Sequence, residues 1–322
     1  MNNAHRLPGD GRFWFGPPMP VPSEVFASLP AEWRKPRVTA WSKTNAGGRA
    51  LESFLEGPSF DRDGNLWVVD IPNGRVFSID PSGHWRLVIE YDGWPNGLKL
   101  DANGTVYIAD YRRGILLLDT VRGTVAPLVE EYRSEGFKGV NDLFFARNGD
   151  LYFTDQGQTG WQDPTGRVFR LEPGGPLRCL MDRIPSPNGL CMNLEETQLY
   201  VGVTRANAVW RLPLMGDGGV SKVGTWVQMS GGVAGPDGLA LDAEGGLVVA
   251  HPGTTVWRFD RHGMPTHLVD APVDAMFTNV AYGHGPLATS LYMTQSRTGE
   301  VWRATMPVAG NPLFSHPERS AT

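Results

Sequence analysis

Short apolar stretches recur along the chain, and turn residues separate each one from its neighbours. Six of these stretches are rich in β-branched and aromatic residues and are too short for helices: LWVVD, VYIAD, LYFTD, LYVGV, LVVAH and LYMTQ. The dipeptides Asp63-Gly64, Asn103-Gly104 and Asn148-Gly149 precede the first three, and such dipeptides are typical of β-hairpin turns. The pattern predicts short antiparallel strands throughout the chain.

A polar residue stands before the first apolar strand of each repeat. These residues, called the anchors below, are Glu56, Asn96, Asn141, Asn188, Asp237 and Asn279. Their positions place successive repeats 40 to 49 residues apart. A period in the forties with several short strands per repeat is typical of propeller blades. The sequence therefore predicts an all-β fold, a six-bladed β-propeller.

The repeats leave little chain for a second domain. We expect an N-terminal arm over residues 1–36 that covers one end of the propeller, a propeller over residues 37–310, and a C-terminal tail over residues 311–322. Within the arm, Ser23 is a suitable N-cap and Pro36 follows the end of a predicted helix over residues 23–33. Residues 37–41 are predicted to form a strand that completes the last blade.

The anchors are candidates for a metal site on the central axis. The first strand of each blade lines the channel of a propeller, so equivalent residues form a ring. Ca²⁺ takes about six to eight oxygen ligands, and this ring offers carboxylate and amide oxygens. Turn formation and water binding are the alternatives. In the first five repeats, however, the hairpin turn begins seven residues after the anchor, so the anchor lies at the other end of the strand.

Composition narrows the classes of partner and compartment. The net charge is −5, which disfavours nucleic-acid binding. The 40 glycines and 26 prolines agree with many turns. No apolar run is long enough to span a membrane, and the first 20 residues lack the apolar core of a signal peptide. We therefore expect a cytoplasmic protein in which Cys179 and Cys191 stay reduced. The sequence does not indicate an oligomeric state.

Four motifs in blade order resemble a known family. They are Glu56-Gly57-Pro58, Asn141-Asp142, Ser186-Pro187-Asn188-Gly189-Leu190 and Gly235-Pro236-Asp237-Gly238-Leu239. Over about residues 50–305 the chain resembles the SMP-30/gluconolactonase family, six-bladed propellers that include regucalcin-like proteins and sugar lactonases. The resemblance implies a lactonase, a carboxylic ester hydrolase that acts on a small-molecule lactone with one divalent metal, Ca²⁺ before Zn²⁺, Mn²⁺ or Mg²⁺. All-oxygen ligation agrees with this order, because Zn²⁺ favours nitrogen and sulfur ligands.

The resemblance also implies roles for the anchors. Glu56, Asn188 and Asp237 match metal ligands, and Asn141 matches a residue that completes the metal site or contacts the substrate. Asp237 matches the acid/base residue, and Glu56 is a second candidate for the working base. The metal would polarise the lactone carbonyl for attack by water. No G-x-S-x-G motif points to a covalent route.

Loops that follow the second strand of each repeat supply further substrate contacts. The candidates for substrate binding, beside Asn141, are Asn96, Arg112, Arg205 and His251, and Trp94 and Trp161 are candidates for an aromatic wall. Regucalcin-like members carry an arginine where this chain has Gly139, so a less polar lactone than gluconolactone is an alternative substrate. A metal-dependent phosphotriesterase-like hydrolase and a non-catalytic metal-binding propeller are the alternative functions.

Overall fold

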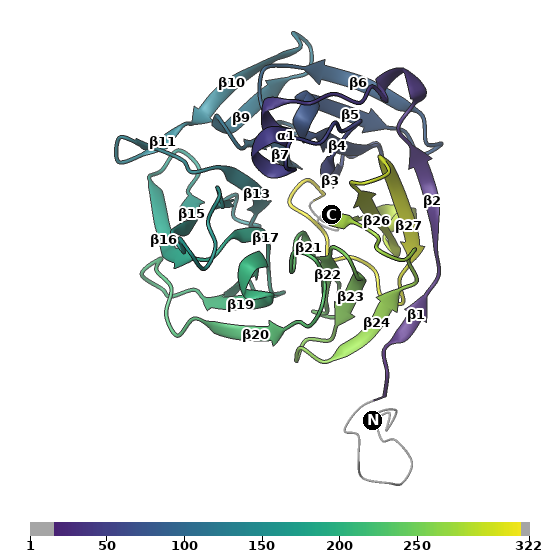
Figure 1. Cartoon of the computed structure of the whole chain (residues 1–322). Coiled ribbons are helices and arrows are strands. Elements are labelled where there is room, and N and C mark those ends of the chain that lie inside the picture. Colours follow the sequence, from purple (N-terminus) through teal and green to yellow (C-terminus); the bar gives the residue numbers. More distant parts are fainter. Residues whose placement is uncertain (1–15, 317–322) are drawn as a thin grey trace, which may run out of the picture.

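The computed structural model describes residues 16–316, and its strands form six blades around a central axis (Figure 1). This confirms the predicted six-bladed propeller. Blade 1 comprises β3 (Leu55–Phe60), β4 (Leu66–Asp70), β5 (Arg75–Ile79) and β6 (Trp85–Glu90), and blade 2 comprises β7 (Pro95–Leu100), β8 (Val106–Asp110), β9 (Gly114–Asp119) and β10 (Thr124–Val129). Blade 3 comprises β13 (Val140–Phe145), β14 (Leu151–Asp155), β15 (Gly166–Leu171) and β16 (Leu177–Ile184).

The remaining blades follow the same antiparallel order. Blade 4 comprises β17 (Pro187–Met192), β18 (Gln198–Val203), β19 (Ala208–Pro213) and β20 (Gly224–Gln228). Blade 5 contains β21 (Leu239–Leu241), β22 (Leu247–His251), β23 (Thr255–Phe259) and β24 (Pro265–Val269), and blade 6 contains β25 (Phe277–Tyr282), β26 (Ser290–Gln295) and β27 (Glu300–Thr305). Outside the blades are the hairpin of β11 (Glu131–Tyr132) and β12 (Glu135–Gly136) and the 3-10 turns η1 (Ala31–Trp33), η2 (Ile71–Asn73), η3 (Thr204–Ala206) and η4 (Gly285–Leu287).

The N-terminal segment closes the ring. β2 (Ser23–Ser28) pairs antiparallel with β27 as the fourth strand of blade 6, and β1 (Met19–Val21) pairs parallel with β24 on blade 5. The helix predicted over residues 23–33 is therefore wrong: its first part is β2, and only η1 is helical. The free edge of β27 supplies backbone partners that outweigh the local helix signals. Residues 1–15 of the expected arm lie outside the described part of the chain.

The strand predicted over residues 37–41 is also wrong. Arg37 forms only an isolated bridge with Leu51, and residues 40–45 form the short helix α1 (Ala40–Asn45). Thr39 caps this helix, because its side chain accepts a hydrogen bond from the Ser42 amide while the Ser42 hydroxyl accepts one from the Thr39 amide. This capping box gives the segment a local reason to be helical.

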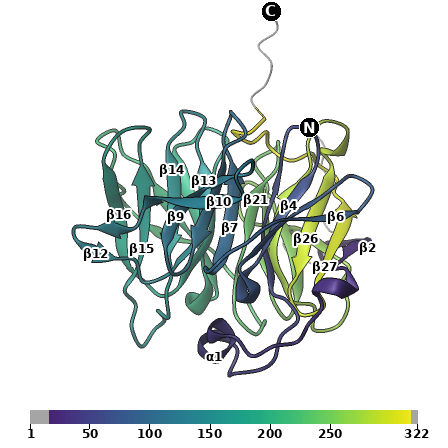
Figure 2. The same cartoon turned by 90° about the horizontal axis from the view of Figure 1, so that it is seen from above.

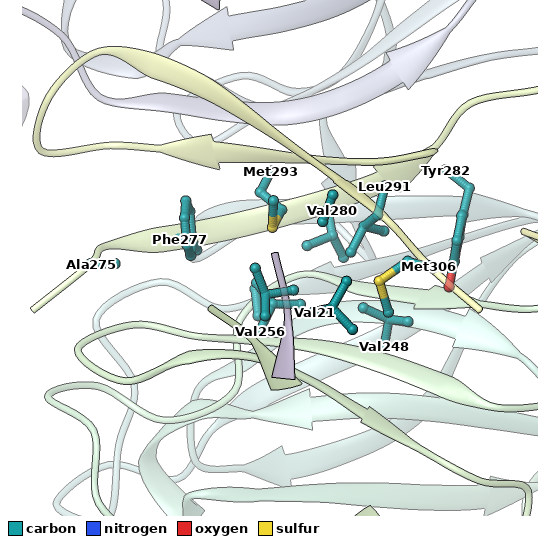
Figure 3. Packing of buried hydrophobic residues seen from close by; sticks show 13 residues of the cluster. Val21, Val248, Val256, Ala275, Phe277, Val280, Tyr282, Leu291, Met293 and Met306 are labelled. Carbon is teal, nitrogen blue, oxygen red and sulfur yellow. The ribbon is translucent and has the colours of Figure 1, made fainter. Parts of the chain in front are cut away.

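Apolar clusters fill the spaces between neighbouring blades. In the cluster between blades 5 and 6, Val21 of β1 joins Val248 and Val256 on one side, opposite Phe277 and Leu291 of blade 6 (Figure 3). Val248 and Phe277 are completely buried. The N-terminal strand therefore contributes to the core as well as to the sheet edge. No helix among residues 16–316 is long and apolar enough to cross a membrane.

Different segments lie at the two ends of the channel. α1 lies at one end, and the C-terminal segment that runs to residue 316 lies at the other (Figure 2). In that segment, Phe314 packs on Phe145 of blade 3 at 5.4 Å between ring centroids, and the Ser315 carbonyl accepts a hydrogen bond from Arg62 of blade 1. The tail thus spans separate blades. Residues 317–322 lie outside the described part of the chain.

Candidate metal and substrate site

An irregularity in strand pairing marks the anchor in most blades. The register between the first two strands shifts at five places: Glu56/Ser59, Pro95/Gly97, Val140/Leu143, Pro187/Leu190 and Phe277/Asn279. A β-bulge adds a residue to one strand and changes the direction of the side chains beside it. The repeated bulge allows the anchor and the residue after it to approach the axis together.

The first strands of neighbouring blades approach each other closely at the anchors. A Cβ atom on Gly97 would lie 2.8 Å from the carbonyl oxygen of Asn141, and one on Gly189 would lie 2.4 Å from that of Asp237. Only glycine leaves room for such contacts. Hydrogen bonds from Thr154 Oγ1 to the Asn188 carbonyl and from Asn279 to Glu56 join two further pairs of blades. The anchors therefore form a ring, as the repeat predicts.

Neighbouring side chains hold the amides of Asn141 and Asn188 in defined orientations. Asn141 Nδ2 donates to Gln156 Oε1 at 2.7 Å, and Gln156 Nε2 donates to Ser186 Oγ at 2.9 Å. Asn188 Nδ2 donates to Thr204 Oγ1 at 3.2 Å. Asn188 Oδ1 is buried and has no hydrogen-bond partner among the described residues. An unpaired buried acceptor is costly, so a hydrogen-bond donor or a cation bound to this oxygen would be favourable.

Two anchor carboxylates lie in surroundings that disfavour their charge. Burial raises the pKa of Glu56 to about 7, and the Asp142 carboxylate adds to the increase, although hydrogen bonds from Asn279 and Gly57 oppose it. Burial also raises the pKa of Asp237 well above its usual range, with the charges of Glu56 and Asp142 as further causes. The charge of Glu56 thus acts on Asp237, and a cation bound by both carboxylates would relieve the repulsion.

Asp142 and Asn279 meet across the axis beside Glu56. Asn279 Nδ2 donates to Glu56 Oε2 at 3.0 Å and to Asp142 Oδ2 at 3.3 Å, and Lys99 Nζ lies 3.9 Å from Asp142 Oδ1. The sequence analysis missed Asp142, although its signal was available. The residue after the anchor is glycine in blades 1, 2, 4 and 5, but it is aspartate in blade 3.

The same comparison corrects the sixth anchor. Asn279 pairs with Thr294 on the second strand of its blade, as Gly97 pairs with Ala109 on the second strand of blade 2. Asn279 therefore occupies the position after the anchor, and Thr278 is the anchor of blade 6. The sixth repeat matches the sequence pattern least closely, so Asn279 could be taken for its anchor. The pairing register places Asn279 one residue after the anchor.

The donor set fits a hard divalent cation. Among residues 16–316, no three His, Cys, Asp or Glu side chains lie close enough to form a metal site by themselves, so a cation here would need amide oxygens beside the two carboxylates. The unpaired Asn188 Oδ1, on a side chain that contacts Asp237, is the observation that favours a cation. Oxygen donors of mixed charge suit Ca²⁺ rather than Zn²⁺.

Comparison with known proteins identifies the family. Residues 54–297 match the model of the SMP-30/Gluconolactonase/LRE-like region. The chain belongs to this family. A gluconolactonase of Zymomonas mobilis is 28% identical over 262 residues, which cover 71% of this chain and 73% of the relative. The lactonase drp35 of Staphylococcus aureus strain MRSA252 is 27% identical over 223 residues, which cover 66% of this chain and 68% of the relative.

Solved structures of SMP-30/gluconolactonase proteins share the propeller. A gluconolactonase from Xanthomonas campestris has a TM-score of 0.70 at 23% identity, covering 91% of this chain and 98% of that one. A calcium-binding protein, regucalcin, from Agrobacterium tumefaciens has a TM-score of 0.71 at 22% identity, covering 92% and 99%. At these identities, the likeness shows a shared fold and nothing beyond it.

The other residues expected at the substrate lie in different surroundings. Arg112 is bound by Asp92 at 2.8 Å and lies over the Trp94 ring at 5.4 Å, whereas Arg205 is exposed and its charge lowers the pKa of Asp237. Asn96 is buried, and its carbonyl lies against Gly57. Arg205 is thus the better placed of the two arginines to reach a ligand beside Asp237.

His251 lies inside blade 5 with both ring nitrogens engaged. Nδ1 lies 2.8 Å from Thr254 Oγ1, and Nε2 lies 2.9 Å from Asn207 Oδ1. Burial lowers the pKa of His251 to about 4, so the ring is neutral at physiological pH. A substrate contact by His251 stays a prediction, and it would require one of these hydrogen bonds to open.

Proposed function

We propose that this protein is a metal-dependent lactonase that opens a small-molecule lactone at the axial site. The unpaired, buried Asn188 Oδ1 on a residue that contacts the Asp237 carboxylate is the observation that supports it most directly. Membership of a family that includes a gluconolactonase and a lactonase among its relatives agrees with it. We also retain the cytoplasmic location expected from the sequence, which cell fractionation would test.

Four residues would hold the cation: Glu56, Asn141, Asn188 and Asp237. Ca²⁺ is the expected ion, and Mg²⁺, Mn²⁺ and Zn²⁺ are the alternatives for such an oxygen-rich site. When bound, the ion supplies a Lewis acid that polarises the lactone carbonyl. Gln156 and Thr204 accept hydrogen bonds from the two amide nitrogens, which would leave the amide oxygens available to the ion.

Asp237 is the better placed of the two candidate bases. Glu56 Oε2 already accepts hydrogen bonds from Asn279 and the Gly57 amide, and Glu56 is only 4% exposed. Asp237 is half-buried and keeps contact with solvent. A water molecule can therefore approach the Asp237 carboxylate more readily than that of Glu56.

The proposed reaction is a hydrolysis in which all atoms balance. A water attacks the carbonyl carbon while Asp237 accepts one of its protons. The ring C–O bond then breaks, and the departing alkoxide takes up a proton, so that one lactone and one water become one hydroxycarboxylic acid. Asp237 would return to the departing ring oxygen the proton that it accepted from the water.

The deciding experiment is a pH-indicator assay on lactones after EDTA treatment, with and without added Ca²⁺. We expect hydrolysis that depends on the metal and that falls by about 100-fold or more in Asp237→Asn. Phosphotriester hydrolysis in its place would assign the site to phosphorus esters. Calcium binding without hydrolysis of either class would make the protein a non-catalytic metal-binding propeller.

A further inference from the structure

One backbone hydrogen bond recurs next to the anchors and defines equivalent positions around the axis. In five blades, the residue two before the anchor accepts this bond from the residue that follows the second strand. The pairs are Ile71 N to Phe54 O, Tyr111 N to Trp94 O, Gln156 N to Gly139 O, Thr204 N to Ser186 O and Ser296 N to Met276 O. We call Phe54, Trp94, Gly139, Ser186 and Met276 the entrance ring. Phe54 packs on Trp41 of α1, which places the ring on the α1 side of the anchors.

Three of the five members of the entrance ring have large apolar side chains. Met276, Phe54 and Trp94 come from the consecutive blades 6, 1 and 2, and each is only half-buried. The ring centroids of Phe54 and Trp41 are 4.9 Å apart, and Trp41 is buried, so α1 covers one side of Phe54. Three large apolar side chains therefore keep partial contact with solvent two residues before the anchors.

Tyr111 continues the apolar surface into blade 3. A Cβ atom on Gly139 would lie 2.6 Å from both Cε2 and Cζ of Tyr111, so the tyrosine ring occupies the place of a side chain at residue 139. Its hydroxyl accepts a hydrogen bond from Gln158 Nε2 at 2.8 Å, and its ring lies 5.8 Å from that of Trp94. Any larger residue at position 139 would displace the tyrosine ring.

The opposite part of the entrance ring is polar but already paired. Ser186 Oγ accepts a hydrogen bond from Gln156 Nε2, and Gln156 in turn holds Asn141. No member of the entrance ring carries a charge. A ligand above the anchors would therefore meet mainly apolar side chains on one side, where Arg112 lies over the Trp94 ring, and paired polar groups on the other.

We propose that the entrance ring binds the apolar substituent of an alkyl- or aryl-substituted lactone, in preference to a polyhydroxylated sugar lactone. This rests on the lactonase function proposed above. An apolar substituent is stabilised by leaving water against Phe54, Trp94 and Met276. Sugar hydroxyls need partners when water is removed, and Phe54 and Met276 offer none, while Trp94 offers only its indole N–H.

A matched pair of substrates tests the proposal. δ-Hexalactone and δ-decalactone share the lactone ring and a secondary leaving oxygen, and they differ only in the length of the alkyl substituent. We expect kcat/KM to be roughly tenfold higher for δ-decalactone, mainly through a lower KM, as burial of about two methylene groups predicts. D-Glucono-δ-lactone should be the poorest of the three.

Two tryptophan variants separate the entrance ring from the general surface. Trp94→Gln should reduce the preference for δ-decalactone at least about threefold. Trp226→Gln is the matched control, because Trp226 is also half-buried but lies on β20, the outer strand of blade 4, and is not part of the ring. Equal kcat/KM for the two lactones in the wild type, or an equal loss of preference in both variants, would overturn the proposal.

Binding of non-hydrolysable analogues keeps the two proposals distinguishable. Titration calorimetry would compare 6-pentylpiperidin-2-one with 6-methylpiperidin-2-one, the lactams that correspond to the two lactones. Tighter binding of the pentyl lactam by roughly tenfold supports the entrance ring even if no lactone is hydrolysed, in which case the lactonase function fails alone. Equal affinities of the two lactams would contradict the entrance-ring proposal.

Discussion

Glu56→Gln should make the metal-free protein more stable at alkaline pH, although it removes a carboxylate from the site. Glu56 is 4% exposed, and its Oε2 accepts hydrogen bonds from Asn279 and Gly57, which a glutamine oxygen can also accept. The substitution therefore keeps the shape and these contacts while it removes the buried charge. The charge itself lies near Asp142 and Asp237 and is unfavourable without a cation.

The magnitude follows from the shift in pKa. Burial raises the pKa of Glu56 from the ordinary 4.5 to about 7. At about 1.4 kcal/mol per pKa unit, ionising Glu56 in the folded metal-free protein costs about 3 kcal/mol. Because the folded pKa is the higher one, the folded wild type keeps its full stability below pH 4.5, where Glu56 is protonated. It loses about 3 kcal/mol as the pH rises through about 7 and Glu56 ionises.

Urea unfolding in EDTA, followed by tryptophan fluorescence, measures this effect. The free energy of unfolding of Glu56→Gln, relative to wild type, should rise by about 3 kcal/mol between about pH 5 and about pH 8.5. Glu135→Gln, a substitution at an exposed residue of β12, is the control and should show no such change. With Ca²⁺ added, the wild type should gain stability and Glu56→Gln should gain much less. A relative stability that is the same at both pH values, or that falls at the higher one, would refute the reasoning.

Three further predictions concern the metal site and the core. Thr204→Val should weaken Ca²⁺ binding by about tenfold in calorimetry, because Asn188 Nδ2 loses its acceptor, and Thr204→Ser should restore it; equal binding by both variants would remove Thr204 from the site. Ca²⁺ binding near pH 7 should release protons, because the raised pKa values of Glu56 and Asp237 must fall when the cation binds; calorimetry in buffers of different ionisation enthalpy measures the release, and identical heats would contradict it. Phe169→Ala should reduce the free energy of unfolding by about 3–5 kcal/mol in urea, since Phe169 is completely buried, whereas Val121→Ala, at a residue that is 95% exposed, should change it little.

Repetition in the chain made the fold and the ring predictable. Each blade carries its own strands and turns, so the period and the polar residue at the start of each repeat could be found by comparing one stretch with another. A residue-by-residue alignment of the repeats separates Thr278 from Asn279. It also distinguishes Asp142 from the glycines at the equivalent position of the first, second, fourth and fifth repeats. Local patterns of this kind are visible because every repeat solves the same packing problem.

The closure of the ring could not be predicted from local signals. Residues 23–28 carry an N-cap residue and a following proline that favour a helix, yet they form β2 because β27, far away in the sequence, leaves an open edge. Residues 37–41 show the opposite error: part of this segment is helical because Thr39 and Ser42 cap α1. In the first segment, pairing with β27 outweighed the local helix signals. In the second, the helix cap outweighed the apolar pattern of a strand.

Six strand-rich repeats around an axis, with carboxylate or amide side chains at equivalent places in the first five, follow from the amino-acid sequence alone. The orientation of these side chains depends on the folded structure. Thr204 and Gln156 turn the amides of Asn188 and Asn141, and Tyr111 fills the space beside Gly139. The physical reason is that periodicity is a property of each repeat, whereas orientation, burial and pKa depend on contacts between residues of different blades and loops.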